Sequence, residues 1–484
     1  MSIICEDCGH LNWYDVRFLP GTPAAQRAEL ADIQHQLKVL KARDRDLKAA
    51  LASVVYPVLT LPPEITSHIF LDCLPFHGRV QPSSIKAPLV LAQVCQYWRD
   101  IALATPQLWS SIDMKLEIGQ PNIPDKGTIA LLRTWLSRAK RSPISLTLRL
   151  PYHQPISKEV ISVIPAYAGQ LHRLELQASD SDCETLRAMC SDFPILRDIA
   201  ITCYGSGPGP FSMFRSALAL REIRLPHTSC PNGAFLQPYV SLHTLRLGEM
   251  SVATLLDMLT DLPQLLHLDT KIDDYPPFDS VGVVPVTANL ESLIIRGREE
   301  APDQAPDPPV LDYLTLPKLR RLELHYRLQL QALASFCIRS ACVLEHLRLQ
   351  VFTETECWGL MHMLPNFSGI TSFDLDTYTC LDSVTYSLQD TTLLPHLRSL
   401  RLNSWRSGID YATLVWCLRI RNRDLKSFTL DFENPRVAEL GGLPTDNLIL
   451  AELESIVAGG MEVRIWTSEG VWPGWTVDPA ERFP

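Results

Sequence analysis

Five segments of the chain repeat one spacing of leucines: LHRLEL at residues 171–176, LHTLRL at 242–247, LRRLEL at 319–324, LEHLRL at 344–349 and LRSLRL at 397–402. Weaker copies of this L-x-x-L-x-L pattern begin at Leu196, Leu220, Leu265, Leu290, Ile370 and Leu425, and successive copies begin 22 to 29 residues apart. Apolar residues at alternate positions place their side chains on one face of a strand. Each copy therefore predicts a short strand, and we expect similar strands at residues 144–150 and 461–466.

Helical stretches separate several of these strands, for example at residues 252–262, 328–338 and 411–421. A strand, a turn and a helix in about 25 residues are typical of a leucine-rich-repeat solenoid. One unit of this size cannot bury its own leucines, so neighbouring units must stack into a continuous core. The sequence therefore predicts an α/β horseshoe of parallel strands and helices over residues 117–466. The repeats are expected to be irregular, because the asparagine that follows the strand in such proteins is mostly missing.

The residues between the leucines face away from the core and form the concave surface of such a solenoid. Several of these positions hold arginines, interleaved with acidic residues, and we select five as candidate target-binding residues: Arg224, Arg246, Arg321, Arg348 and Arg401. Two interpretations remain open. The mixed charges form either a solvated polar face or a recognition surface for a polypeptide, in which arginines are frequent anchors.

Residues 60–112 predict a small helical unit before the repeats. Pro62 and Pro63 suit the start of a helix, where a missing N–H costs nothing. That helix places Ile65 and Ile69 on one side, and Pro75 ends it. A second helical run follows a polar loop and ends before Pro106. About fifty residues make a marginal core, so the unit is expected to bury an apolar face against a neighbour.

This unit resembles the F-box, particularly in the F-box-like proteins of mushroom-type fungi. The resemblance lies in five islands in the same order and spacing: LPPEI at 61–65, IF at 69–70, VC at 94–95, WRDIA at 98–102 and TPQLWSSI at 105–112. It implies an F-box over residues 57–116 that docks on a Skp-type adaptor. The adaptor-binding residues carried over are Leu61, Pro62, Ile65, Ile69, Leu91, Val94 and Trp98, of which Trp98 belongs either to this surface or to the core. A longer insert at residues 76–88 puts the middle helix of the F-box in question.

The resemblance also implies a function, that of substrate-recognition subunit in an SCF-type ubiquitin ligase. Such a subunit reaches a cullin through the adaptor and presents a target protein on its repeats. The alternative is a protein-interaction scaffold that never joins a ligase. We expect no catalysis and no cofactor, because the sequence holds no G-x-S-x-G, H-E-x-x-H or G-x-G-x-x-G motif in a suitable setting.

Residues 23–56 predict a long amphipathic helix ahead of this unit. Its apolar positions follow a heptad spacing with one polar position, Asp44, in the seam: Leu30, Ile33, Leu37, Leu40, Leu47 and Leu51. A lone helix of this length is marginal in water, so the stripe must be buried. It either pairs as a coiled coil with a second copy or a partner, or packs on the protein's own surface.

Composition limits the other classes of function. The 484 residues are 46% hydrophobic, which excludes global disorder, and a net charge of −10 argues against a nucleic-acid partner. No run of about 18 apolar residues predicts a membrane span, and the first residues do not resemble a signal peptide. The thirteen cysteines are scattered, as in proteins with reduced thiols, so we expect a cytoplasmic or nuclear location.

The two ends of the chain are expected to be a tail at residues 1–22 and a cap or tail at 467–484. Cys5 and Cys8 have the spacing of a zinc knuckle, but the next cysteine is Cys73 and zinc requires four ligands. The pair is therefore either two thiols on a tail or half of a zinc site shared between two chains. We predict no metal site within one chain.

Overall fold

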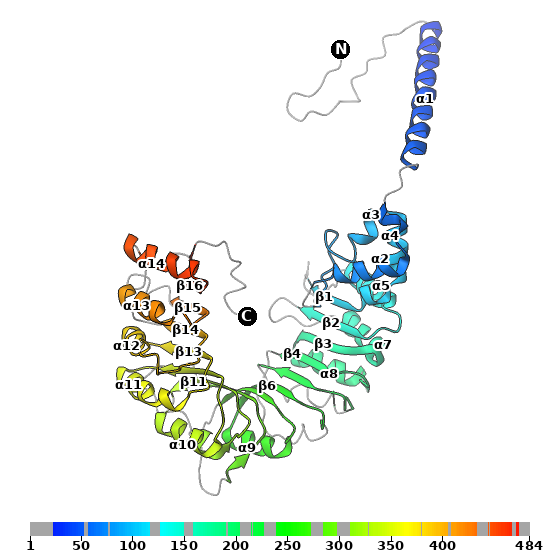
Figure 1. The fold of residues 1–484 in the computed structure, drawn as a ribbon. Coiled ribbons are helices and arrows are strands. Elements are labelled where there is room, and N and C mark those ends of the chain that lie inside the picture. The colour runs from blue at the N-terminus through cyan, green and yellow to red at the C-terminus, as the bar shows by residue number, and fades with distance from the viewer. Residues whose placement is uncertain are drawn as a thin grey trace.

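A computed structural model of the chain describes residues 23–52, 57–75, 78–116, 126–149, 158–189, 192–203, 214, 216–226, 239–272, 284–297, 310–327, 329–378, 380–404, 408–432, 444, 446–466 and 471–473. The repeats form an arch, with strands along its inner side and helices along its outer side (Figure 1). The predicted α/β leucine-rich-repeat horseshoe is confirmed.

One sheet of 15 strands runs through the arch, in the order β1 to β7, then β9, and then β11 to β17. The strands are β1 (Ser111–Lys115), β2 (Ile144–Arg149), β3 (Leu171–Ala178), β4 (Asp198–Cys203), β5 (Glu222–Leu225), β6 (Thr244–Met250), β7 (His267–Ile272), β9 (Ser292–Arg296), β11 (Arg321–Arg327), β12 (His346–Val351), β13 (Ser372–Thr377), β14 (Ser399–Ser404), β15 (Ser427–Phe432), β16 (Glu462–Trp466) and β17 (Val471–Trp472). Neighbouring strands from β1 to β16 are parallel. A separate pair, β8 (Val286–Thr287) and β10 (Leu314–Thr315), is also parallel.

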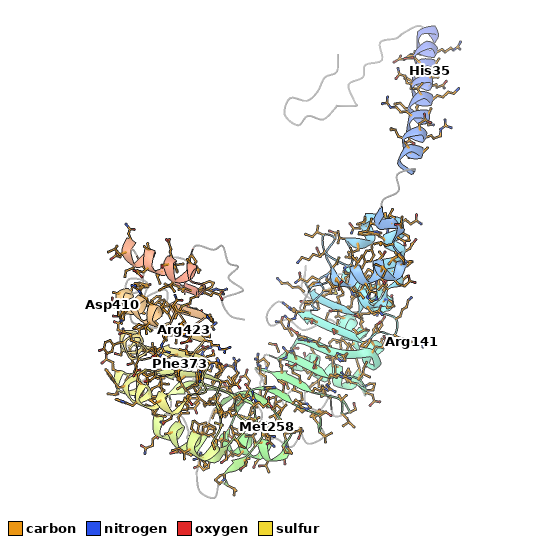
Figure 2. The ribbon with its side chains drawn as sticks, viewed as in Figure 1. His35, Arg141, Met258, Phe373, Asp410 and Arg423 are labelled. Atoms are coloured by element: carbon orange, nitrogen blue, oxygen red, sulfur yellow. The ribbon has the colours of Figure 1, made fainter. Side chains whose placement is uncertain are left out.

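The strands pair in register, so equivalent apolar residues of successive repeats stack on one another. Leu347 of β12 lies opposite Phe373 of β13, which lies opposite Leu400 of β14. All three side chains are buried. Met258, on helix α9 (Val252–Asp261), also lies in the buried layer between sheet and helices (Figure 2). Full burial of one such side chain contributes about 1.5–3 kcal/mol, and the stack repeats this gain along the arch.

Helices cover the outer side of the sheet. They are α5 (Lys126–Arg138), α6 (Lys158–Ile161), α7 (Val163–Tyr167), α8 (Asp180–Met189), α9, α10 (Leu330–Ser340), α11 (Glu354–Met363), α12 (Leu381–Ser387), α13 (Tyr411–Arg421) and α14 (Asn447–Ala458). The predicted helix at 328–338 lies two residues further on, at 330–340. The buried hydroxyl of Ser340 accepts the N–H of Leu316 at 3.0 Å, which fixes the end of α10 beside β10.

The helical unit ahead of the arch consists of η2 (Pro57–Thr60), α2 (Pro63–Asp72), α3 (Leu91–Val94), α4 (Gln96–Ala104) and η3 (Pro106–Trp109). Pro62 and Pro63 stand at the start of α2, as predicted. Residues 78–88 of the insert contain no helix. Val80 is buried, and its carbonyl accepts the N–H of Asp113 on β1 at 2.8 Å. The insert therefore protects the first edge of the sheet.

The helical unit and the repeats share one core at their junction. The Trp109 and Trp135 rings meet edge-on at 4.9 Å, and the Trp135 indole donates to the Ser111 carbonyl at 3.1 Å. The Arg138 guanidinium lies 4.4 Å from the centre of the Trp109 ring, in a cation–π contact. Strand β1, within the predicted F-box residues 57–116, thus belongs to the sheet of the repeats.

The predicted N-terminal helix is present as α1 (Pro23–Ala52), which stands apart from the arch (Figure 1). Leu30, Ile33, Leu37, Leu40 and Leu47 are all exposed, so the described residues of the chain do not cover the stripe. The interpretation in which the helix packs on the protein's own surface does not agree with this arrangement.

At the C-terminal edge, β17 turns back antiparallel to β16 and partly covers the last repeat. Residues 467–470 and 474–484 of the predicted cap lie outside the described residues. Among the helices that the structure describes, none combines the length and apolar character needed to cross a membrane.

We predict that Trp135→Ala destabilises the helical unit together with the first repeats. Trp135 is buried, and loss of a buried tryptophan costs about 3–5 kcal/mol. Hydrogen exchange should accelerate in α2 and α4 as well as in β1 to β3. The control Ile338→Ala, at an exposed site on α10, should leave hydrogen exchange in both regions unchanged. Faster exchange in β1 to β3 alone would contradict a shared core.

Candidate protein-docking surfaces

The first surface is an exposed apolar face of α2. Ile65 and Ile69 are one helical turn apart and are 49% and 44% exposed, while Thr66 and Phe70 on the adjacent face are buried. Pro62, at the start of the helix, is also exposed. The helix therefore uses one face for the core and presents a second apolar face to solvent, which a folded protein usually does for a partner.

The other predicted adaptor-binding residues divide between surface and core. Val94 at the end of α3 is 59% exposed, whereas Leu91 is only 7% exposed and fills the core. The prediction for Leu91 is therefore corrected. Trp98 is half-buried, with its ring 5.0 Å from that of Phe70, so it serves mainly as a packing residue. Leu61 is half-buried, and its carbonyl accepts the Tyr97 hydroxyl at 3.0 Å.

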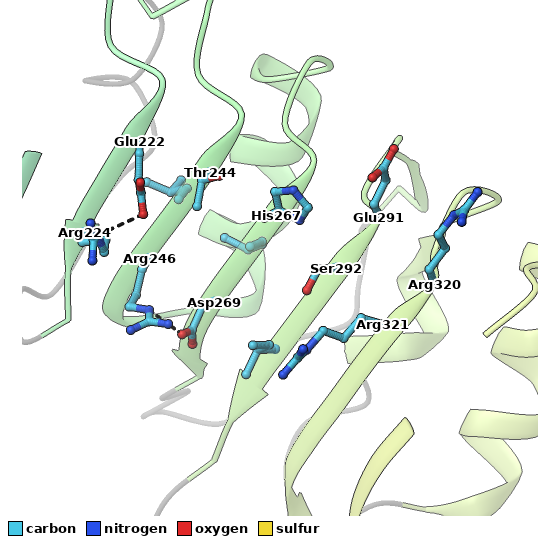
Figure 3. Close-up of a pocket in the computed structure, with 13 residues that line it drawn as sticks. Glu222, Arg224, Thr244, Arg246, His267, Asp269, Glu291, Ser292, Arg320 and Arg321 are labelled. Atoms are coloured by element: carbon cyan, nitrogen blue, oxygen red, sulfur yellow. Dashed lines mark ion pairs between the residues drawn. The ribbon is translucent and has the colours of Figure 1, made fainter. Parts of the chain in front are cut away.

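The second surface is a hollow on the concave face, with a volume of about 510 Å³, that spans β5 to β11. Figure 3 shows Arg224 and Arg246 on neighbouring strands and Arg320 and Arg321 across the hollow from them. Arg224 pairs with Glu222 at 2.9 Å, and Arg246 pairs with Asp269 at 2.7 Å.

Beyond the hollow, charges alternate along the sheet in register. Glu323 lies opposite Arg348, Arg348 opposite Asp374, and Asp374 opposite Arg401. Arg348 also binds both carboxylate oxygens of Asp376, at 3.1 and 3.2 Å. Because neighbouring strands are about 4.8 Å apart, the long arginines cover the shorter acids, and all three acids are buried.

The pKa values of two of these acids shift in opposite directions. Burial alone would raise the pKa of Glu323, but hydrogen bonds to His325 and His346 and the charge of Arg321 lower it well below the ordinary value. For Asp374, burial outweighs the attraction of His346, Arg401 and Arg348 and raises the pKa. The alternating charges therefore include one carboxylate, Glu323, whose charged form is strongly stabilised, and one, Asp374, whose charged form is destabilised by burial.

Residues 58–115 match the F-box-like family model. The chain contains an F-box-like domain. Solved structures similar to the chain include an internalin from Listeria monocytogenes, with 14% identity, 75% of this chain and 88% of that chain covered, and a TM-score of 0.31. They also include a leucine-rich-repeat protein from Leptospira interrogans, with 13% identity, 75% and 97% covered, and a TM-score of 0.28. These scores are low, so the fold assignment rests on the chain's own repeats. The curated proteins contain no match.

Together, the F-box-like domain and the leucine-rich repeats indicate a protein-interaction adaptor. Modules of both kinds are typically non-catalytic. Among the residues that the structure describes, no group of three or more His, Cys, Asp or Glu side chains is placed to hold a metal ion. Cys5 and Cys8 lie outside the described residues, so neither interpretation of that pair is tested.

The five predicted arginines all lie on the concave strands, and four of them form ion pairs with acids of the same surface: Arg224, Arg246, Arg321 and Arg348. Arg401 lies opposite Asp374 in the strand register. Arg348 is largely buried and is tied to Asp376. Arg296, which also binds Asp269, was missed because it follows the L-x-x-L-x-L segment of its strand. A search that continued the alternation one position beyond each segment would have found it, together with His325 and Asp376.

We predict that Glu323→Gln weakens the acid dependence of stability. A carboxyl whose pKa is lowered in the folded state stabilises the fold above its unfolded pKa, of about 4.3, and this contribution is lost as the pH falls. Between about pH 5 and pH 3 the wild-type protein should therefore lose more stability in urea unfolding than the variant.

Asp374→Asn is the matched control, because a carboxyl with a raised pKa has the opposite effect on the pH dependence of stability. Its charged form opposes folding, so the variant should lose at least as much stability on acidification as the wild type. Equal slopes for wild type and Glu323→Gln would contradict the assignment of Glu323.

Proposed function

We propose that the chain is the substrate-recognition subunit of an SCF-type ubiquitin ligase. The F-box-like domain binds a Skp-type adaptor and through it a cullin, and the concave face of the repeats binds a target protein. The observation that carries the proposal is the exposed Ile65–Ile69 face within the matched domain. Burial of such a face is the main source of free energy in protein association.

The adaptor-binding surface consists of Pro62, Ile65, Ile69 and Val94. Each isoleucine exposes nearly half of its area. Full burial of such a side chain contributes about 1.5–3 kcal/mol, and binding of the adaptor gains the part of this that remains exposed in the free protein. Leu91 and Trp98 support this surface from the core rather than touch the partner.

The mechanism is proximity. Because the F-box-like domain shares its core with the first repeats, the adaptor and the target are held at a fixed separation across one arch. The subunit raises the effective concentration of the target near an enzyme that carries ubiquitin, and the chemistry takes place elsewhere.

A scaffold that never joins a ligase is the second candidate, and the exposed stripe of α1 favours it. We propose that this stripe pairs with a second copy of the chain. Asp44 interrupts the apolar seam and is held by Lys48 of the same helix at 2.8 Å. A polar residue in the seam lowers the stability of such a pair. Recovery of stable partners from native extracts without adaptor or cullin would favour the scaffold.

For the adaptor, we predict that Ile65→Asp combined with Ile69→Asp abolishes binding of the full chain to a purified Skp-type adaptor. Two charges would then have to be buried at the interface without partners. Calorimetry measures the affinity, and circular dichroism checks the fold. The control Ile338→Asp replaces an isoleucine on α10 that is even more exposed, and this variant should bind normally. Unchanged binding by a folded double variant would exclude this surface.

For α1, we predict a concentration-dependent dimer in sedimentation velocity. Leu37→Glu should dissociate it, and Asp44→Leu should tighten it, because the seam loses its polar interruption. Lys38→Glu, adjacent in sequence but outside the heptad seam, should change little. A wild-type chain that stays monomeric at high concentration, or a Leu37→Glu chain that stays dimeric, would contradict self-association.

A further inference from the structure

The hollow on the concave face contains a like-charge pair that the fold does not require. Arg224 of β5 lies directly opposite Arg246 of β6 in the strand register. Like charges at directly opposed positions destabilise a sheet. Elsewhere on this surface, from β11 to β14, opposed charges alternate in sign. The arginine pair in the hollow therefore departs from the alternation of β11 to β14, and on its other side two acids, Asp198 of β4 and Glu222 of β5, lie opposite each other.

Acids at the base of the hollow hold the arginines in place and remain covered by them. The Asp269 side chain is 8% exposed, whereas those of its two partners, Arg246 and Arg296, are 47% and 45% exposed. Across the hollow, the Glu323 side chain is 6% exposed beneath Arg321, which is 51% exposed. The carboxylates are thus out of reach of solvent, and the guanidinium groups present their outer edges to it.

Positive charge therefore reaches the surface at Arg246, Arg296 and Arg321, whose acids lie beneath them, whereas Glu222 and Glu291 also line the hollow. A single carboxylate, Asp269, serves two guanidinium groups, and the directly opposed Arg224 has its own acid, Glu222. At the far end of the hollow, Arg320 pairs with Glu345 at 2.8 Å, and Glu291 also lines the hollow (Figure 3). Arginines held by buried acids are pre-organised, so a ligand would not have to order them.

We propose that this hollow binds an acidic segment of the target protein, whose carboxylates pair with Arg246 and Arg321. The inference deepens the proposed function, because it assigns the chemical class of the target segment. Arginine suits this role, since its planar fork can bind a carboxylate through two hydrogen bonds.

The dimensions and charges favour a peptide over a nucleic acid. The hollow spans five strands about 4.8 Å apart, roughly 19 Å, which about six extended residues cover. A continuous phosphate backbone would meet Glu222 and Glu291, and the chain as a whole carries a net charge of −10. An extended peptide directs alternate side chains to opposite faces, so only every second acidic side chain faces the hollow.

The test measures the fluorescence anisotropy of a labelled hexaglutamate peptide with the full chain, at low and at moderate salt. We expect saturable binding that weakens with salt, and at least about tenfold weaker binding of a hexaglutamine peptide. The variant Arg246→Gln combined with Arg321→Gln should also bind hexaglutamate at least about tenfold more weakly. Its fold should persist, because Asp269 keeps Arg296, and Glu323 keeps His325 and His346.

The matched control is Arg401→Gln, a concave arginine on β14 outside the hollow, which should bind hexaglutamate like the wild type. Equal binding of the two peptides, an unchanged double variant, or an equal loss in Arg401→Gln would overturn the proposal. Tighter binding of a labelled oligothymidylate than of hexaglutamate would overturn it in favour of a nucleic acid.

Adaptor binding, measured on the same samples, separates this proposal from the proposed function. Adaptor binding without peptide binding would overturn the acidic-segment proposal alone. Peptide binding that depends on Arg246 and Arg321, without adaptor binding, would support the hollow as a peptide site in a scaffold and would overturn the ligase role.

Discussion

The stack of apolar side chains from one strand to the next is the constraint on which the rest of the structure depends. A single repeat exposes its leucines on both sides, and only an in-register neighbour can cover them, as Phe373 does between Leu347 and Leu400. The two ends of the stack need special protection. At the first edge the insert around Val80 supplies it, and at the last edge β17 turns back on β16.

The same constraint explains why the F-box-like domain does not form a core separate from that of the repeats. Its last residues become β1, and Trp109 packs on Trp135 of the first outer helix. A small helical unit of this size has a marginal core of its own. By joining the solenoid core it gains stability, and its exposed face on α2 takes a defined position relative to the concave strands.

The sequence predicted the architecture well because the decisive signal is local and repeated. Leucine spacing fixed the strands, and the prolines before α2 fixed its start. The place of β1 in the sheet could not be predicted because this strand has no L-x-x-L-x-L pattern; its membership in the sheet depends on pairing with β2. Leu91 was misplaced because a family motif does not distinguish residues that touch a partner from those that support them. Only some arginines of the hollow could be predicted from the sequence. The pairing of Asp269 with both Arg246 and Arg296 depends on which strands become neighbours.

The central claim is that one rigid arch carries an adaptor-binding face at one end and a separate target-binding hollow on its concave side. Hydrogen exchange of the full chain, with and without a saturating Skp-type adaptor, tests it most directly. The account predicts slower exchange in α2 and α3 on adaptor binding, and no change in β5 to β11. Protection of β5 to β11, or bound adaptor without protection of α2, would contradict it.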